Sequence, residues 1–286
     1  MRSLLFVPGD SERKLAKGLE SGADALIVDL EDSVATDGKA RARAITAEFV
    51  ASSKTGPAIY VRVNDLTTGL TDDDLGAVMK AAPAGIMLPK STSGDDVGRL
   101  AVRLRVLEAE NGLQDGVTKI LPIITETPLG VLNAGTYGNC GPRLSGLTWG
   151  AEDLAAEIGA SANRDEDGRY TDLFRFARLS TILAATAAEV APIDTVFPNF
   201  RDTEAFTRDC VEGARDGFTG RMAIHPAQVA IINEVFTPSG EAVAHAQAVV
   251  DAFAAAGNPG VVAIDGKMFD RPHLKRAERL LARVAG

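Results

Sequence analysis

The sequence predicts an α/β fold, a (β/α)8 TIM barrel followed by a helical C-terminal extension. Eight short runs of strand-forming residues recur as far as Pro226, and helical stretches separate them. The runs are almost continuously apolar, as expected for parallel strands that are covered on both faces. Eight strands alternating with helices are typical of a closed barrel, whose usual size is about 250 residues. An open, doubly wound sheet is the competing fold, because the number of strands does not establish closure.

The expected strands are, in order, SLLFVPG, ALIVDLED, AIYVRVN, GIMLPKS, ILPIITE, LSGLTWGAED, IDTVFPNF and RMAIHP. Between them lie amphipathic stretches such as ERKLAKGLESG, DDVGRLAVRLRVLEAENG and DTEAFTRDCVEGARDG. These three stretches close with glycine, the usual residue after the last helical turn. In ITETPLG, Thr127 and Pro128 are expected to be the N-cap and the first residue of a helix after the fifth strand.

The chain continues for about sixty residues beyond the eighth strand. This part is predicted to be helical except for PGVVAIDGKMFD, and FTPSGEAV is expected to connect it to the barrel. We therefore place the barrel at residues 1–230 and a helical lid or extension at residues 231–286.

Composition and charge narrow the class of protein. A chain of 286 residues that is 45% hydrophobic can bury a large core. No apolar run is long enough to span a bilayer, and Pro8 to Asp10 interrupt the apolar start, which indicates a first strand and not a signal peptide. The formal net charge of −9 argues against a broad nucleic-acid surface. Cys140 and Cys210 are too few for a disulfide framework or a thiolate metal site, so a reduced, cytoplasmic setting is expected.

Polar side chains follow the predicted strands at their C-terminal ends, where barrels of this type carry their chemistry. They are Asp29, Glu31 and Asp32 after the second strand, Arg62 and Asn64 after the third, Lys90 after the fourth, Glu126 after the fifth, Gly150, Glu152 and Asp153 after the sixth, and His225 after the eighth. A closed barrel would bring these side chains to one mouth.

Glu126 and Asp153 are the metal candidates. Two carboxylates from adjacent strands, completed by water and substrate oxygens, suit octahedral Mg²⁺, which usually keeps few protein ligands. Alternatively, Glu126 is a favourable charge near the positive end of the next helix, and Asp153 is the N-cap of LAAEIG. Their occurrence together at neighbouring strand ends favours the metal.

The stretch DLEDSV places three acids within four residues, which raise one another's pKa unless cations or metal-bound waters compensate. We interpret Glu31 and Asp32 as acceptors for such waters or as partners of a basic residue. The alternative is a polar loop in which Asp32 or Ser33 caps a turn. Arg62 ends an apolar strand, where an unpaired guanidinium would be costly. Its planar fork suits a substrate carboxylate or a developing enolate oxygen, and an ion pair with Glu31 or Asp32 is compatible with that use.

Four further groups have ordinary structural explanations. His225 is interpreted as a structural hydrogen-bonding residue, and Lys90 as a site residue or a salt bridge at the barrel mouth. Arg13 and Lys17 lie four residues apart on a predicted helix, so they can share one face. A phosphate-bearing ligand is one use for that face, and solvation is the other.

Eight motifs occur together in a fixed order: RSLLFVPGD, DLEDSV, VRVN, MLPK, ITETPLGV, WGAEDLAAEIG, AIHPAQV and DGKMFDRPHLKRAERLL. The set resembles citrate lyase β-subunit-like proteins of the HpcH/HpaI aldolase/citrate lyase family, over essentially the whole chain. The resemblance implies a Mg²⁺-dependent (β/α)8 barrel, usually a homotrimer. It also implies a CoA ester lyase that reversibly cleaves a 3-hydroxyacyl-CoA of the citryl-, malyl- or citramalyl-CoA type into acetyl-CoA and a 2-oxoacid.

The resemblance also implies roles for the residues at the barrel mouth. Glu126 and Asp153 would bind Mg²⁺, and Arg62 would contact the 2-oxoacid and the reacting oxygen. Backbone amides around Gly150 and Ala151 would take the oxoacid carboxylate.

For the CoA moiety, the resemblance places Phe6 and Lys17 at contact positions, with Arg13 beside them, and Ser11 stands where some relatives carry a basic residue. In GKMFDRP it implies that Asp270 reaches a neighbouring subunit's site as the general acid/base. Without the family, Asp270 would be interpreted as a helix N-cap. The candidate catalytic residues are Asp270, Arg62, Glu31 and Asp32.

Other functions stay open at this point. A malyl-CoA thioesterase would need the same contacts and a placed water, and a citrate lyase β subunit would act only on an acyl carrier protein. A pyruvate aldolase without CoA is a third reading, against which the tail with Asp270 and the basic residues near Lys17 weigh, and a metal-binding protein without catalysis is a fourth. The expected partners are a CoA thioester, a 2-oxoacid and further copies of the chain, with neither nucleic acid nor membrane.

Overall fold

The computed structural model describes residues 1–285, which fold as two compact units. The first unit is Met1–Phe236, and the second begins at Thr237. Within residues 1–285, no helix combines the length and apolar character that a membrane span requires.

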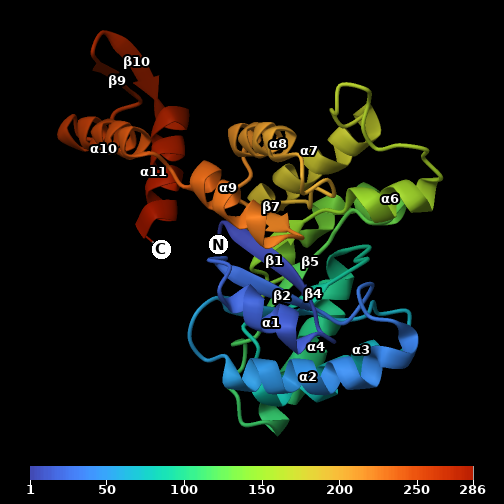
Figure 1. Cartoon of the computed structure of the whole chain (residues 1–286). Helices are drawn as coiled ribbons and strands as arrows, with labels where there is room; N and C mark the ends of the chain where they lie inside the picture. The colour runs from blue at the N-terminus through green and yellow to red at the C-terminus, as the bar shows by residue number, and fades with distance from the viewer. Residues whose placement is uncertain (286) are drawn as a thin grey trace. The chain divides into compact units, whose positions relative to one another are not determined.

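Eight parallel strands form the sheet of the first unit (Figure 1). They are β1 (Ser3–Pro8), β2 (Ala25–Asp29), β3 (Ala58–Arg62), β4 (Gly85–Leu88), β5 (Lys119–Pro122), β6 (Gly146–Thr148), β7 (Ala191–Asp194) and β8 (Gly220–Ala223). Each overlaps one of the eight predicted runs. The largest difference is at β7, which begins two residues before the predicted run and ends at Asp194, so that the following residues form a loop.

The sheet closes between its two outer strands. The strand order is β5-β4-β3-β2-β1-β8-β7-β6, and parallel bridges join Ile120 to Leu144 and Ile123 to Thr148 across the remaining gap. The Ile124 amide also donates to the Thr148 carbonyl at 2.9 Å. These contacts bring β5 and β6 together, so the (β/α)8 barrel is confirmed and the open sheet is wrong.

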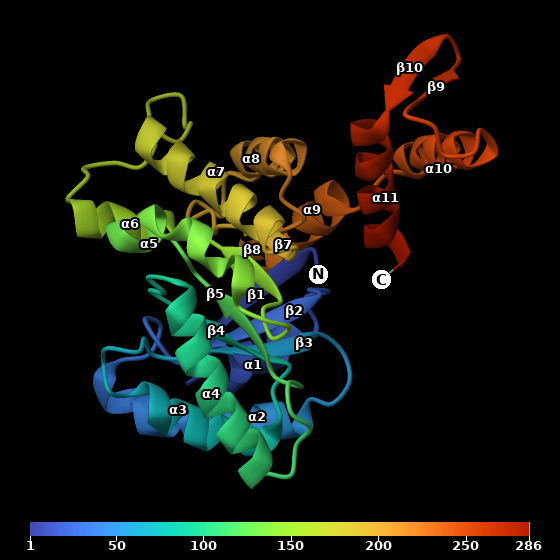
Figure 2. The same cartoon turned by 180° about the vertical axis from the view of Figure 1, so that it is seen from behind.

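Helices surround the strands on the outside of the barrel (Figure 2). They are α1 (Glu12–Leu19), α2 (Lys39–Ser52), α3 (Thr71–Val78), α4 (Gly94–Glu110), α5 (Pro128–Leu132), α6 (Ala151–Ile158), α7 (Asp172–Ala187), α8 (Thr203–Asp216) and α9 (Pro226–Phe236), with short 3-10 turns at Thr36–Gly38, Met79–Ala81 and Ala134–Asn139. The Thr127 hydroxyl accepts a hydrogen bond from the Gly130 amide at 3.1 Å. The predicted start of α5, with Thr127 as N-cap and Pro128 first, is therefore confirmed.

The barrel strands are buried on both faces, which explains their apolar runs. One cluster of side chains fills the barrel interior: Leu4, Ala25, Ile27, Tyr60, Met87, Leu121, Ile123, Ile193 and Met222. A larger cluster lies between the strands and the surrounding helices. Each strand thus contributes one side chain inward and the next outward, and the last inward layer becomes the floor of the mouth.

The second unit consists of α10 (Gly240–Ala255), an antiparallel hairpin of β9 (Val261–Ile264) and β10 (Lys267–Asp270), and α11 (Arg271–Ala285). Asp265 and Gly266 both have positive φ, as the tight turn of a hairpin requires. The division between the units falls six residues beyond the predicted boundary at 230. Helix α9 stays with the barrel, and Asn233 on α9 lies 2.7 Å from the Ser3 hydroxyl of β1.

Candidate active site

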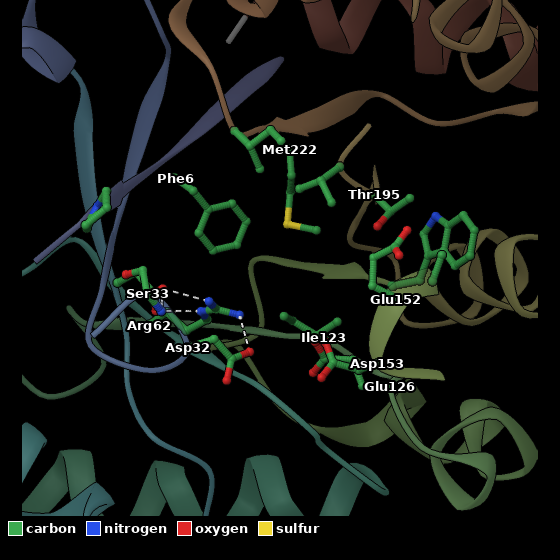
Figure 3. Close-up of a pocket in the computed structure, with 17 residues that line it drawn as sticks. Phe6, Asp32, Ser33, Arg62, Ile123, Glu126, Glu152, Asp153, Thr195 and Met222 are labelled. Carbon is green, nitrogen blue, oxygen red and sulfur yellow. Dashed lines mark hydrogen bonds and ion pairs between the residues drawn. The ribbon is translucent and has the colours of Figure 1, made fainter. Parts of the chain in front are cut away.

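A cavity of about 430 Å³ lies at the C-terminal ends of the barrel strands (Figure 3). Its lining comes from the ends of β1, β2, β3, β5, β6, β7 and β8 and the loops that follow them. Among the predicted site residues, it brings together Phe6, Asp32, Arg62, Glu126, Gly150, Ala151 and Asp153. The predicted convergence at one mouth is confirmed for these residues, whereas Asn64 does not line the cavity and donates to Asp74 of α3 at 2.6 Å.

Glu126 is held deep in this cavity, with 3% of the residue exposed. Its Oε2 accepts a hydrogen bond from the Lys90 amide at 2.6 Å. Lys90 has φ of +51°, a strained conformation for a residue with a side chain, and this turn aims its N–H at the carboxylate. Burial and the nearby charge of Asp153 hold the pKa of Glu126 well above its usual value.

Asp153 lies in the first turn of α6, where a negative charge is favourable. Gly150 is the N-cap of that helix, so the alternative reading of Asp153 as an N-cap is wrong. One Asp153 oxygen lies 3.8 Å from the Lys90 ammonium, so Lys90 contacts both metal candidates, one through its amide and one through its side chain.

Arg62 is surrounded by carboxylates. Two of its nitrogens each lie 2.7 Å from an oxygen of Asp29, and a third lies 3.0 Å from Glu31. Its guanidinium also lies 4.9 Å from the centroid of the Phe6 ring. Although burial opposes the charged form, these acids raise the pKa of Arg62 above its usual value. Arg62 therefore stays a cation at any working pH.

Asp29 is the main partner of Arg62, a role that the sequence reasoning missed. The ion pair with Glu31 is confirmed, whereas Asp32 is 3.9 Å from Arg62 and its side chain is 58% exposed. Asp29 also accepts hydrogen bonds from the Glu31 and Ser33 amides at 2.9 and 3.0 Å. Asp29, and not Asp32 or Ser33, therefore caps this turn. The signal in the sequence was limited to the positions of Asp29 and Arg62 in two consecutive predicted strands; their pairing in register appears only in the structure.

Glu31 bridges the two cations of the site, since its other oxygen contacts the Lys90 ammonium. The expected salt bridge of Lys90 at the barrel mouth is confirmed. Burial raises the pKa of Glu31 more than Arg62 and Lys90 lower it. Arg62, Lys90, Asp29 and Glu31 thus form one paired cluster next to the cavity.

The residues expected near CoA are spread over β1 and α1. Phe6 lines the cavity, whereas Arg13 and Lys17 are exposed on α1 and are not part of its lining. His225 lies nearby and has a structural role, because its Nδ1 accepts from the Ala227 amide at 3.2 Å and its ring stacks on Phe200 at 4.5 Å.

Asp270 ends β10 and directly precedes α11 in the second unit. Its Oδ1 lies 2.5 Å from Nδ1 of His273, and its side chain is 42% exposed. The hydrogen bond with His273 holds the pKa of Asp270 below its usual value. The sequence reasoning did not anticipate this histidine.

A buried ion-pair network behind the cavity wall was also missed. Asp194 accepts hydrogen bonds from Trp149 Nε1 at 2.7 Å and from Arg178 at 2.6 Å. Arg221, with no exposed surface, lies 2.5 Å from Asp209. The available signal was the presence of Asp194 and Arg221 inside two apolar strands. Through Trp149, which lines the cavity, this network fixes the end of β6.

Two family models match the chain. Residues 2–226 match the model of the HpcH/HpaI aldolase/citrate lyase family. The chain belongs to this family. Residues 176–285 match a second model, described as C–C bond lyase of the TIM-barrel fold. These two matches confirm the predicted enzyme class, a carbon–carbon lyase.

Relatives of this HpcH/HpaI family member cover almost its whole length. It is 35% identical to a (3S)-malyl-CoA thioesterase of Cereibacter sphaeroides, over 99% of this chain and 94% of the relative. It is 33% identical to a citrate lyase subunit beta of Leuconostoc mesenteroides, over 98% of this chain and 92% of the relative.

A solved structure is similar over the whole chain. It is the protein CitE of Mycobacterium tuberculosis in complex with magnesium, acetoacetate and coenzyme A. The TM-score is 0.76 at 31% identity, and the match covers 100% of this chain and 98% of CitE.

Proposed function

We propose that the chain is a Mg²⁺-dependent CoA ester lyase that reversibly cleaves a 3-hydroxyacyl-CoA into acetyl-CoA and a 2-oxoacid. The observation that carries this proposal is the meeting of Glu126, Asp153 and Arg62 in one cavity at the barrel mouth. Membership in a carbon–carbon lyase family and the likeness to a CitE complex with magnesium and coenzyme A support it.

The donor set fits Mg²⁺. Glu126 and Asp153 offer only oxygen ligands, and Mg²⁺ usually binds through one or two carboxylates while it keeps several waters. Among residues 1–285, no group of three or more His, Cys, Asp and Glu side chains is arranged to hold a metal, so substrate and water oxygens would complete the shell. Burial, and after it the nearby charge of Asp153, raises the pKa of Glu126, and a divalent cation bound between the two carboxylates would favour their charged forms.

When bound, Mg²⁺ supplies Lewis-acid stabilisation of the substrate hydroxyl and carbonyl oxygens. Cleavage would release the hydroxyl proton to solvent and pass the electron pair of the carbon–carbon bond to the acetyl-CoA enolate. Arg62 would offset the negative charge on the deprotonated hydroxyl oxygen before that bond breaks. The amides around Gly150 and Ala151, at the start of α6, bind the oxoacid carboxylate, because the first N–H groups of a helix have no partner within it.

Asp270 is the proposed general acid/base. In the cleavage direction its carboxyl group delivers a proton to the carbon that becomes the methyl group of acetyl-CoA. In the condensing direction its carboxylate removes that proton. Asp270 of one copy would act in the cavity of another copy, which makes the second unit a lid and requires an oligomer. We propose a homotrimer in the cytoplasm, and light scattering after size exclusion tests the trimer.

In this scheme Glu31 and Asp32 assist from the edge of the site. Glu31 balances Arg62 and Lys90, and exposed Asp32 accepts from metal-bound water. Phe6, Arg13 and Lys17 contact the CoA moiety.

The decisive experiment incubates the protein and Mg²⁺ with citryl-, malyl- and citramalyl-CoA and identifies the products by mass. We expect acetyl-CoA and a 2-oxoacid from at least one of them. Glu126→Ala and Asp153→Ala should lose Mg²⁺-dependent oxoacid binding, whereas Glu157→Ala, an exposed acid on the same helix as Asp153, should keep it. Asp270→Asn should keep that binding and lose most turnover. Wild-type turnover by Asp270→Asn would remove Asp270 from the reaction.

A malyl-CoA thioesterase is the second candidate, because a relative of that name is 35% identical. Hydrolysis would release free hydroxyacid and CoA in place of acetyl-CoA, so the same product analysis separates the two activities. Turnover of free acyl-CoA by the isolated chain would exclude dependence on an acyl carrier protein, which a citrate lyase β subunit would show.

A further inference from the structure

Two of the three histidines of the chain lie beside Asp270 in the second unit. His245 on α10 and His273 on α11 both pack against Phe269, which precedes Asp270 on β10 (Figure 2). The two histidines and Phe269 line a cavity of about 240 Å³ between α10 and α11. Among residues 1–285, His273 is the one side chain that forms a hydrogen bond or an ion pair with the Asp270 side chain. His273 therefore connects the proposed general acid/base to the packed part of the second unit.

The packing of the second unit fixes the ring of His273. Phe269 is 8% exposed, and the two rings are T-shaped, with their centroids 5.4 Å apart and their planes at 72°. The next residue on α11, Leu274, is buried in the same cluster as Phe269. Because both the first turn of α11 and the ring itself are packed, the imidazole cannot turn away from Asp270 without losing these contacts.

One ring nitrogen of His273 meets two groups of Asp270. Its Nδ1 lies 2.5 Å from the carboxyl oxygen Oδ1, and the Asp270 amide donates to the same nitrogen at 3.3 Å. A protonated Nδ1 donates to a carboxylate, and an unprotonated Nδ1 accepts from a carboxylic acid. The two side chains can therefore stay bonded whether or not Asp270 carries a proton, as a residue that both gives and takes a proton requires.

The pair is accessible from outside the second unit, because the side chains of Asp270 and His273 are 42% and 40% exposed. A carboxyl group with this exposure changes rotamer readily unless a neighbour holds it. Proton transfer requires the two heavy atoms to approach within about 2.6–3.2 Å. A misplacement of about 1 Å can cost roughly a hundredfold in rate. The orientation of Asp270 is therefore a requirement of the reaction, and His273 is the side chain placed to meet it.

We propose that His273 is a positioning residue, which holds the Asp270 carboxyl group in the orientation in which it exchanges a proton with the substrate carbon. The inference rests on the proposed function, in which Asp270 is the general acid/base, and names the residue through which the second unit orients it. His273 itself transfers no proton to the substrate in this role.

The test measures kcat and KM of the full chain, saturated with Mg²⁺, for whichever of citryl-, malyl- and citramalyl-CoA it cleaves. His273→Ala should lower kcat about 10–100-fold and leave KM within about twofold, since substrate still binds but the carboxyl group is seldom oriented for proton transfer. His273→Asn should restore kcat to within about threefold of the wild type, because the amide nitrogen of asparagine can take the place of Nδ1. His245→Asn is the matched control. This exposed histidine packs against the same Phe269 but is not the partner of Asp270, so its kcat should equal that of the wild type.

A double-mutant cycle with Asp270→Asn separates positioning from a purely structural role. If His273 acts through Asp270, the addition of His273→Ala to Asp270→Asn should change the residual kcat by less than about twofold. A second loss as large as that of His273→Ala alone would show that His273 supports the second unit in another way, and it would overturn the inference.

Two other results would overturn the inference and leave the lyase function standing. They are a wild-type kcat in a natively melting His273→Ala, and a kcat of His273→Asn as low as that of His273→Ala. Wild-type turnover by Asp270→Asn would instead remove Asp270 from the proposed reaction, and this inference with it.

Discussion

Gly150→Ala tests the position of the Glu126 carboxylate without removing any carboxylate. Gly150 has φ of −126° and ψ of 119°, an extended conformation that alanine adopts freely. A Cβ at this position would lie 2.6 Å from Cγ of Glu126 and 3.1 Å from its Oε1. The substitution therefore acts on one side chain and leaves the backbone unstrained.

The size of the effect follows from how tightly Glu126 is held. The two carbons must separate by about 0.8 Å, from 2.6 Å to the 3.4 Å at which ordinary contact begins. Glu126 is buried and its Oε2 is held by the Lys90 amide, so its carboxylate has to shift. Mg²⁺ demands near-octahedral geometry at about 2.0–2.1 Å from each oxygen. We expect Mg²⁺ affinity to fall ~10–100-fold, as when the supports of a metal ligand are removed, which corresponds to about 1.4–2.7 kcal/mol.

The assay is calorimetric titration of Mg²⁺ into the metal-free protein, with a thermal melt to establish that the fold persists. Gly98→Ala is the matched control, because a Cβ at Gly98 on α4 would meet open space, and its Mg²⁺ affinity should equal that of the wild type. If Gly150→Ala melts normally and binds Mg²⁺ as tightly as the control does, Glu126 is not a ligand and the reasoning fails.

Three further variants test buried ion pairs and hydrogen bonds, one at the N-terminal ends of β5 and β6 and two at the site. Although burial opposes it, Arg143 lowers the pKa of Glu108 to about 2. The free energy of unfolding that this pair contributes is therefore complete above pH 4.5 and is lost as the pH falls toward 2. Glu108→Gln should lower the free energy of unfolding by about 2–3 kcal/mol at pH 7, and in urea titrations that free energy should fall less steeply with decreasing pH than in the wild type. The same pH dependence as in the wild type would contradict this. Asp29→Asn breaks the buried pair with Arg62 and should cost about 3–5 kcal/mol in the same titrations; a loss below about 1 kcal/mol would show that Glu31 alone balances the guanidinium. Trp149→Phe removes one buried indole donor and should cost about 1–3 kcal/mol, because its acceptor is left short of a partner; an unchanged melting temperature would refute this.

The strands were predictable because their burial on both faces leaves a local apolar signature. The end of β7 was placed wrongly because the apolar residues after Asp194 do not continue the sheet, and Val196 and Phe197 lie in the loop that follows it. A run of apolar residues does not distinguish a strand from an apolar loop at a barrel mouth. In the second unit, the Asp265–Gly266 turn carries a recognised hairpin signal that the sequence reasoning did not use.

Which charged residues pair with one another was harder to predict than their meeting at the barrel mouth. Several acids near Arg62 could pair with it, and sequence distance does not rank them. The register between β2 and β3 decides for Asp29, and it becomes known only when the sheet is assembled. The buried network around Asp194 depends likewise on α7 and α8 reaching the same strand ends, which no local pattern encodes.

The charged residues at the barrel mouth form two groups, which differ in how far positive charges neutralise the carboxylates. Asp29 and Glu31 face Arg62 and Lys90 at hydrogen-bonding distance, so this group is neutral as it stands. The other group, Glu126 and Asp153, has one amide donor at 2.6 Å and a shared ammonium at 3.8 Å. The deficit of positive charge is therefore local, and it adds to burial, which is the larger cause of the raised pKa of Glu126. A divalent cation bound between Glu126 and Asp153 would remove that deficit without breaking the pairs of Arg62 with Asp29 and Glu31.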